Sequence, residues 1–143
     1  MKIRTEFDCL DRNEFIIFLN SIDNDFTPKL SVKIDFHHYY DKIKGTAKII
    51  SLFDNGELIG LLIYYDNLEQ AQVTLVGVKE HYRGKRISYF MFERLFALVN
   101  KPIKIITWNE NELAKKLYLN LGFEIIECSK NTYGIDEILM VKK

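Results

Sequence analysis

A basic turn stands between an apolar segment and an amphipathic one in the middle of the sequence. The stretch "VTLVGVKEHYRGKRISYFMFERL", residues 73–95, carries Arg83, Lys85 and Arg86 around Gly84. Cations are unfavourable at a helix N-terminus, where free N–H groups and the helix dipole already supply positive potential. We therefore expect an anion to offset this charge, and phosphate is the group that such strand–turn–helix junctions bind.

The alternative to a phosphate site is an ordinary solvated loop. Its cations would then cover the helix end or pair with Glu80 and Glu93. In the functional interpretation, outward N–H groups bind the anion, the basic side chains add charge, and Gly84 lets the ligand approach the backbone. Short motifs of this kind occur often by chance, so the turn alone does not decide the question.

The elements that must position the turn can be predicted from apolar spacing. We expect a strand, a helix, a strand, a helix and two strands over residues 71–78, 84–99, 103–108, 109–122, 123–128 and 137–143. Gly122 ends the second of these helices, in the left-handed conformation that favours glycine. The turn therefore joins a strand to a helix, as a phosphate site requires.

The N-terminal third predicts two helices joined by a polar loop. Asp11 and Glu14 form a capping box, which predicts a helix over residues 11–20. Ser31 is a candidate cap for a second helix over residues 32–43, which carries the cluster "DFHHYY".

A hairpin follows these helices. Residues 47–53 and 58–65 are rich in β-branched and aromatic residues, and Asn55-Gly56 between them suits a tight hairpin turn. The order of elements predicts an α/β domain that is antiparallel in its first half and has helical crossovers in its second.

The composition indicates one globular domain spanning residues 1–143. Hydrophobic residues make up 48% and charged residues 28%, and twenty basic residues balance twenty acidic ones. This balance argues against binding to nucleic acid or to an anionic membrane. Cys9 and Cys128 share no metal-type spacing, and "MKIRTEFDCL" lacks the apolar run of a signal peptide. We expect a cytoplasmic protein without a metal site or a membrane segment.

Two segments resemble the GNAT superfamily of acetyl-CoA-dependent N-acetyltransferases. "VKEHYRGKRIS" is similar to the family's pyrophosphate loop, and "NELAKKLYLNLGF" is similar to its later helix. The resemblance covers about half of the chain. It implies a mixed, mostly antiparallel sheet of six to seven strands flanked by four helices. Residues 1–45 would form the acceptor-side helices and residues 73–123 the acetyl-CoA-binding core.

The loop departs from the family pattern at two positions. Arg83 fills the first place of the pattern, but Arg86 stands where glycine is expected and Ser88 where glycine or alanine is expected. Arg86 is compatible with the loop if its backbone stays helical and its side chain points outward, where it could contact a cofactor phosphate. The resemblance thus implies that acetyl-CoA binds at Arg83, Gly84, Lys85, Arg86, Ile87 and Ser88.

Acetyl transfer needs a neutral amine, a donor for the oxyanion and a proton for the leaving thiolate. The resemblance implies that the donor is a backbone N–H near Gly77 and Val78, where the family's strand bulges away from its neighbour. Tyr118 matches the family's acid, and Asn111 matches an asparagine that reaches the cofactor. Without the resemblance, Tyr118 would be a core aromatic and Asn111 a helix cap.

The sequence does not identify a general base, because the strand before the loop carries no carboxylate. Residues near the strand or on the second N-terminal helix are candidates, each with a surface role as the alternative: Asp66, Glu69, His81, His37 and His38.

The predicted activity is acetyl transfer from acetyl-CoA to a primary amine, by direct attack in a ternary complex. The acceptor would be a small molecule, such as an amino sugar, or a protein. It would lie against the N-terminal region, which offers acids and aromatics: Asp23, Asp25, Phe26, Asp35, Tyr39 and Tyr40. The alternative is a weak or inactive GNAT-fold module that binds coenzyme A as a sensor or as a subunit, and either would be a monomer or a homodimer.

Overall fold

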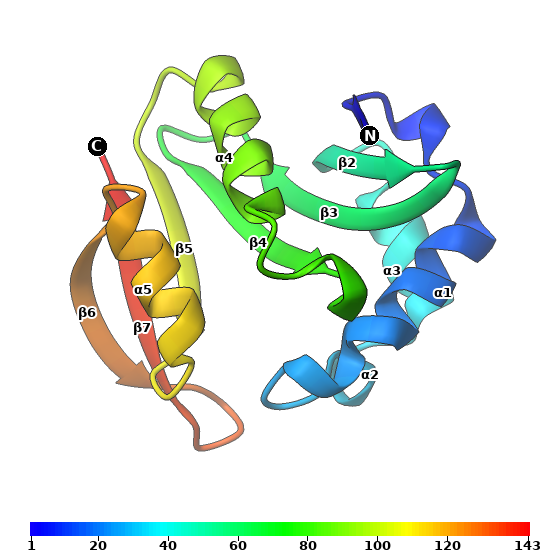
Figure 1. The fold of residues 1–143 in the computed structure, drawn as a ribbon. Coiled ribbons are helices and arrows are strands. Elements are labelled where there is room, and N and C mark those ends of the chain that lie inside the picture. The colour runs from blue at the N-terminus through cyan, green and yellow to red at the C-terminus, as the bar shows by residue number, and fades with distance from the viewer.

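The computed structural model describes residues 1–143 as a seven-stranded sheet with helices on both faces (Figure 1). The strand order is β1-β2-β3-β4-β5-β7-β6, and only β4 and β5 are parallel neighbours. The strands are β1 (Lys2–Arg4), β2 (Lys48–Asp54), β3 (Glu57–Tyr65), β4 (Ala71–Val78), β5 (Ile103–Trp108), β6 (Glu124–Lys130) and β7 (Asp136–Lys142). The helices are α1 (Arg12–Ile22), α2 (Leu30–Lys33), α3 (Phe36–Ile43), α4 (Ile87–Leu98) and α5 (Glu112–Asn120). The predicted fold class is confirmed, with four main helices and the short α2. None of the helices is long and apolar enough to cross a membrane.

The predicted N-cap at Asp11 and the predicted hairpin turn form, although Glu14 does not complete the capping box with its side chain. The carboxylate of Asp11 accepts a hydrogen bond from the N–H of Glu14 at 3.1 Å, and α1 extends to Ile22, slightly beyond its predicted end. Asn55 and Gly56 both have positive φ, 51° and 78°, as a tight turn between two twisted strands requires.

The single helix predicted over residues 32–43 is wrong. The chain becomes extended between α2 and α3, and Asp35 starts α3 by accepting from the N–H of His38 at 3.0 Å. Ser31 caps neither helix, because it lies in the first turn of α2, where its N–H and hydroxyl donate to Asp23 at 2.9 and 2.6 Å. Asp35 is the stronger N-cap for this segment, because its ionised carboxylate also interacts favourably with the helix dipole.

Two apolar cores lie on opposite faces of the sheet. Helices α1, α2 and α3 pack against β2, β3 and β4 on one face, and α4 and α5 pack on the other (Figure 1). The first helix approaches β4 most closely at Gly77, where an added Cβ would collide with Cδ1 of Ile22 and touch Phe18. Glycine at this position therefore lets α1 seat against β4.

The parallel strands β4 and β5 pair over a short length only. Residues 71–73 of β4 pair with residues 103–105 of β5. Beyond them β4 continues to Val78 and β5 to Trp108 without pairing with each other, although each still pairs with its other neighbour. Figure 1 shows the two strands close at one end and apart at the other. We call the paired part of β4 and β5 the closed end of this strand pair, and the part where they separate its open end.

A lysine clamps the closed end. Nζ of Lys101, just before β5, donates to the carbonyl oxygens of Asp66 at 3.1 Å and Leu68 at 2.9 Å. It also lies 2.9 Å from the carboxylate of Asp66, which Lys48 of β2 approaches to 3.4 Å. The hydrogen bond from Lys101 and the charges of both lysines lower the pKa of Asp66.

The substitution Asp66→Asn tests this clamp. The lowered pKa means that ionised Asp66 contributes its full stabilisation at pH values above its ordinary pKa of 3.8, and that this contribution is lost as the pH falls from there through the lowered pKa of the folded state. We expect the free energy of unfolding near neutral pH to fall by about 1–2 kcal/mol in the variant. Urea denaturation should also show a smaller loss of stability than wild type between about pH 5 and pH 3.

Asp136→Asn provides the matched control. Asp136 pairs with Lys130 on the surface, where its side chain is 57% exposed, so its removal should change stability little. Equal effects of the two substitutions would contradict a specific role of Asp66 at the closed end.

Candidate active site

A cleft of about 430 Å³ opens where β4 and β5 separate. Residues 73–78 of β4 and 105–108 of β5 line it, together with parts of α5, the start of α4 and the segment from α1 to α2. The cleft therefore lies between the two layers of helices, with backbone of both strands in its walls.

A β-bulge at Thr74 determines which backbone groups face the cleft. Before the bulge, the N–H of Ala71 donates to the carbonyl of Pro102 at 2.9 Å, so the backbone N–H and carbonyl groups of odd-numbered residues point toward β5. The register of β4 with β3 then shifts by one residue at Thr74. After the bulge, the N–H of Lys79 donates to Ile59 of β3 at 2.9 Å, so odd-numbered residues face β3 instead.

The N–H groups of Val76 and Val78 therefore face the open side of β4. Gly77 itself directs its N–H toward β3, whereas Val78, the other residue named for the donor, faces the open side, as Val76 does. The carbonyl of Val78 already accepts from Nε of Arg83 at 3.1 Å. Val76 thus keeps both its N–H and its carbonyl free of a neighbouring strand.

The first turn of α4 presents a run of free backbone donors. No protein group accepts from the N–H groups between Gly84 and Tyr89, and the helix has no side-chain cap. Arg86 at its start has φ 60° and ψ 24°, in the left-handed region, so the condition that its backbone stays helical is not met. Its side chain does point outward and lies 4.4 Å from the ring centre of Tyr89. A left-handed arginine costs about 1 kcal/mol, which glycine would avoid.

This turn fits a diphosphate. Gly84 also has a positive φ, 77°, and nothing lies within 4 Å of where its Cβ would be. The turn is fixed to the β2–β3 hairpin by Tyr82, whose hydroxyl donates to Asp54 at 2.9 Å. Lys85 and Arg86 are exposed beside the free N–H groups. Backbone donors, flanking cations and open space are the features that anion sites at helix starts share.

Arg83 points away from this turn. Besides its bond to Val78, its guanidinium forms an ion pair with Asp25, in the segment between α1 and α2. Arg83 therefore connects the end of β4 to the opposite helical layer. A phosphate site at this turn would therefore consist of backbone groups with Lys85 and Arg86, and Arg83 would contribute only by holding the end of β4.

Tyr118 brings a single hydroxyl group into the cleft from α5. Its ring packs against Phe92 and Phe123, with centroids 5.7 and 5.8 Å away. The hydroxyl has no hydrogen-bond partner in the protein, although the residue lines the cleft. Burial raises the pKa of Tyr118, so the phenol stays protonated and can donate. The ring of Tyr118 is therefore part of the apolar core, and its hydroxyl is available to donate a hydrogen bond in the cleft.

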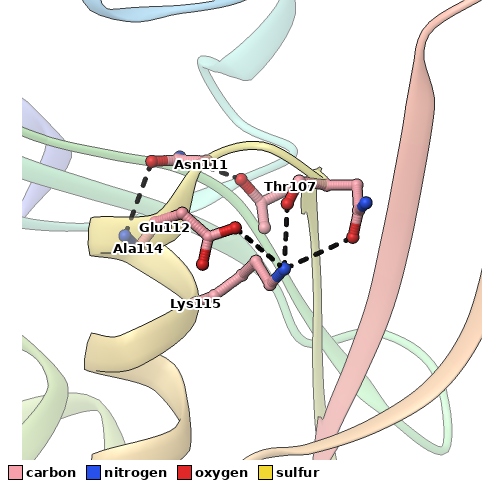
Figure 2. Close-up of polar contacts among 6 residues, drawn as sticks. Thr107, Asn111, Glu112, Ala114 and Lys115 are labelled. Carbon is pink, nitrogen blue, oxygen red and sulfur yellow. Dashed lines mark hydrogen bonds and ion pairs between the residues drawn. The ribbon is translucent and has the colours of Figure 1, made fainter.

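Asn111 caps α5 (Figure 2). Its Oδ1 accepts from the N–H of Ala114 at 3.4 Å and its Nδ2 donates to Oγ1 of Thr107 at 3.0 Å. Lys115 adds a hydrogen bond of 3.0 Å to the carbonyl of Asn109. These bonds hold the start of α5 against the end of β5. The cap is thus observed, and contact of Asn111 with a cofactor stays a prediction.

A family model described as "Acetyltransferase (GNAT) domain" matches residues 24–143. The chain belongs to the GNAT family. GNAT enzymes use acetyl-CoA, so this protein is in a family of acetyl-CoA-dependent N-acetyltransferases. No curated protein matches the chain.

Solved structures of GNAT enzymes share the whole fold. The ribosomal-protein-S18-alanine N-acetyltransferase from Escherichia coli has a TM-score of 0.74 at 17% identity, over 99% of this chain and 92% of that one. An aminoglycoside 6'-N-acetyltransferase complexed with coenzyme A has a TM-score of 0.75 at 14% identity, over 99% and 96%. A spermidine N-acetyltransferase variant from Vibrio cholerae has a TM-score of 0.72 at 18% identity, over 99% and 94%. At these identities the likeness shows the fold alone.

None of the candidate bases lines the cleft of this GNAT domain. Asp66 is bound to Lys101 at the closed end of the sheet. The other four are on the surface away from the cleft: Glu69, His81, His37 and His38. Of the six residues expected near the acceptor, Asp25 and Phe26 line the cleft and the other four do not.

Two cleft residues, Trp108 and Glu137, are absent from the sequence-based candidates. They lie opposite each other in the pairing of β5 with β7. The apolar pattern predicts both strands, and alternation indicates which residues share a face. The pattern does not show that β7 inserts between β5 and β6, and only this order brings Glu137 beside Trp108.

Arg86→Gly tests the left-handed turn. Removing the strained side chain should raise the free energy of unfolding by up to about 1 kcal/mol. Arg86→Ala removes the same charge but keeps a Cβ at positive φ, so it should not stabilise the protein. Denaturation compares the stabilities, and titration with acetyl-CoA shows the contribution of the charge, which both variants lose. Equal stabilities of the two variants would contradict the left-handed conformation.

Proposed function

We propose that this GNAT protein transfers acetyl from acetyl-CoA to a primary amine, by direct attack in a ternary complex. The observation that carries the proposal is the meeting of two unused groups in one cleft. These are the N–H of Val76, exposed by the bulge in β4, and the hydroxyl of Tyr118. When bound, acetyl-CoA supplies an activated acetyl thioester.

The chain would hold the cofactor through its backbone. The free N–H groups from Gly84 to Tyr89 suit the pyrophosphate, with Lys85 and Arg86 beside them. The open edge of β4 suits the amide groups of the pantetheine arm, which would pair with it as an added strand. Ser88, which lines the cleft, is small enough to leave the path between these two sites open.

The reacting atoms would then lie between Val76 and Tyr118. The N–H of Val76 is oriented to stabilise negative charge that develops on the acetyl oxygen. Tyr118, held protonated by burial, would give its proton to the leaving sulfur, and the proton that the attacking nitrogen loses would pass through water and restore the phenol. The acceptor amine would approach from the side of α1 and α2, where Asp25 and Phe26 border the cleft.

The acceptor is a small-molecule amine, such as an amino sugar, or an amine of a protein. The similar structures are named for a ribosomal protein, an aminoglycoside and spermidine, so the shared fold does not select among these classes. The selection must come from side chains that border the cleft on the acceptor side.

Ser88→Glu tests the cofactor site. An acidic residue in the first turn of α4 interacts favourably with the helix dipole, so stability should stay equal or rise. The same charge would repel the pyrophosphate, so the affinity for acetyl-CoA in isothermal titration should fall by at least about 10-fold. We expect micromolar binding by wild type. Unchanged affinity of the variant would place the cofactor elsewhere.

Tyr118→Phe tests the acid. The ring would still pack against Phe92 and Phe123, so the fold and the affinity for acetyl-CoA should persist. Release of coenzyme A with a reactive amine should slow by about 100-fold in kcat. Unchanged kcat would exclude this role. Wild type that binds acetyl-CoA but acetylates no amine in a broad panel would instead be a coenzyme A-binding module.

A further inference from the structure

Four charged side chains line the cleft, and two of them neutralise each other. Asp25 and Arg83 form an ion pair between the α1–α2 segment and the end of β4. The other two, Lys33 of α2 and Glu137 of β7, have no ion-pair partner. Any net electrostatic selection of the acceptor must therefore come from Lys33 or Glu137.

Glu137 lies on the acceptor face of the sheet. Thr107 directs its side chain to Asn111 of α5, so its neighbours Ile106 and Trp108 point to the other face. Trp108 meets Phe26 there, with ring centroids 5.9 Å apart. Glu137 is the register partner of Trp108, and side chains opposite each other in antiparallel strands share a face.

The residues beside Glu137 favour a cation with an apolar spacer. The faces of Trp108 and Phe26 carry negative quadrupole charge, which attracts cations as the carboxylate does. Ile106 precedes Trp108 on the same face and is 46% exposed, so an alkyl segment could cover it. Lys33 is exposed on α2 and contacts no such rings, which makes an anion site on that wall the weaker alternative.

We propose that Glu137 binds a cationic group of the acceptor, so that preferred acceptors carry a second positive charge beyond an apolar spacer. This inference rests on the proposed acetyl transfer and adds the class of amine. The reacting nitrogen would lie between Val76 and Tyr118. The second cation would then lie over β7, about 5 Å beyond β5, the distance between neighbouring strands.

The test uses three amines of equal chain length that differ only in the distal group. They are 1,4-diaminobutane, 4-amino-1-butanol and 4-aminobutanoate, with distal charges that are positive, neutral and negative. Release of coenzyme A by wild type should give the highest kcat/KM for the diamine. Glu137→Gln keeps the size of the side chain and should raise KM for the diamine by about 10-fold, with little change in kcat. It should leave KM for the amino alcohol unchanged.

Lys33→Gln is the control of opposite sign. It removes the other unpaired charge of the cleft, so KM for the diamine should stay equal or fall. A rise in that KM, a fall in kcat without a change in KM in Glu137→Gln, or a wild-type preference for the neutral or anionic amine would overturn the inference. So would a wider panel in which only neutral or anionic amines react. In each of these cases acetyl transfer itself would stand, whereas no transfer to any amine would overturn the proposed function as well.

Discussion

The site depends on one irregularity, the extra residue at Thr74 in β4. A regular strand would direct the same set of N–H groups to β5 along its whole length, and the two strands could pair to their ends. The bulge reverses that alternation halfway along β4, so Val76 and Val78 face an edge from which β5 has already moved away. Unpaired backbone groups in the middle of a sheet are costly unless something satisfies them. The fold thus carries a row of backbone donors and acceptors that suits an extended, amide-containing ligand.

Two contacts hold the two ends of β4. At the closed end, Lys101 ties the turn before β4 to the start of β5 through Asp66 and Leu68. At the open end, Arg83 links the last residue of β4 to Asp25 on the acceptor side. One residue of the loop that resembles a pyrophosphate motif is therefore a structural link between the cofactor side and the acceptor side. Rearrangement of the segment near Asp25 would also be felt at the start of α4.

Sequence patterns predicted most of the elements, but not β1, the division of α2 from α3, or the geometry between the strands. Capping at Asp11, the Asn55-Gly56 turn and the strand–turn–helix at Gly84 are local, and each was predicted from neighbouring residues. The division of α2 from α3 was missed because Asp35 competes with Ser31 as a cap, and the outcome depends on Ser31 bonding to the distant Asp23. The sequence also did not show which N–H groups of β4 face β5, because nothing in "AQVTLVGV" marks the position of a bulge. Glu137 required the strand order itself, which comes from long-range pairing.

The different roles proposed for the two faces of the sheet explain why the two recognisable motifs lie on the side of α4 and α5. On the face of α4 and α5, the proposed cofactor would meet backbone N–H groups and a tyrosine fixed in an aromatic core, so the requirements on sequence are few and recognisable. This tolerance extends to Arg86, because a backbone site needs a conformation and not a particular side chain, and arginine reaches the left-handed conformation at a modest cost. On the other face, the proposed acceptor would meet side chains from α1–α2, β5 and β7, which no backbone requirement restricts. Here this chain has the carboxylate of Glu137 beside the rings of Trp108 and Phe26, and other proteins of this fold are free to have different side chains at these positions.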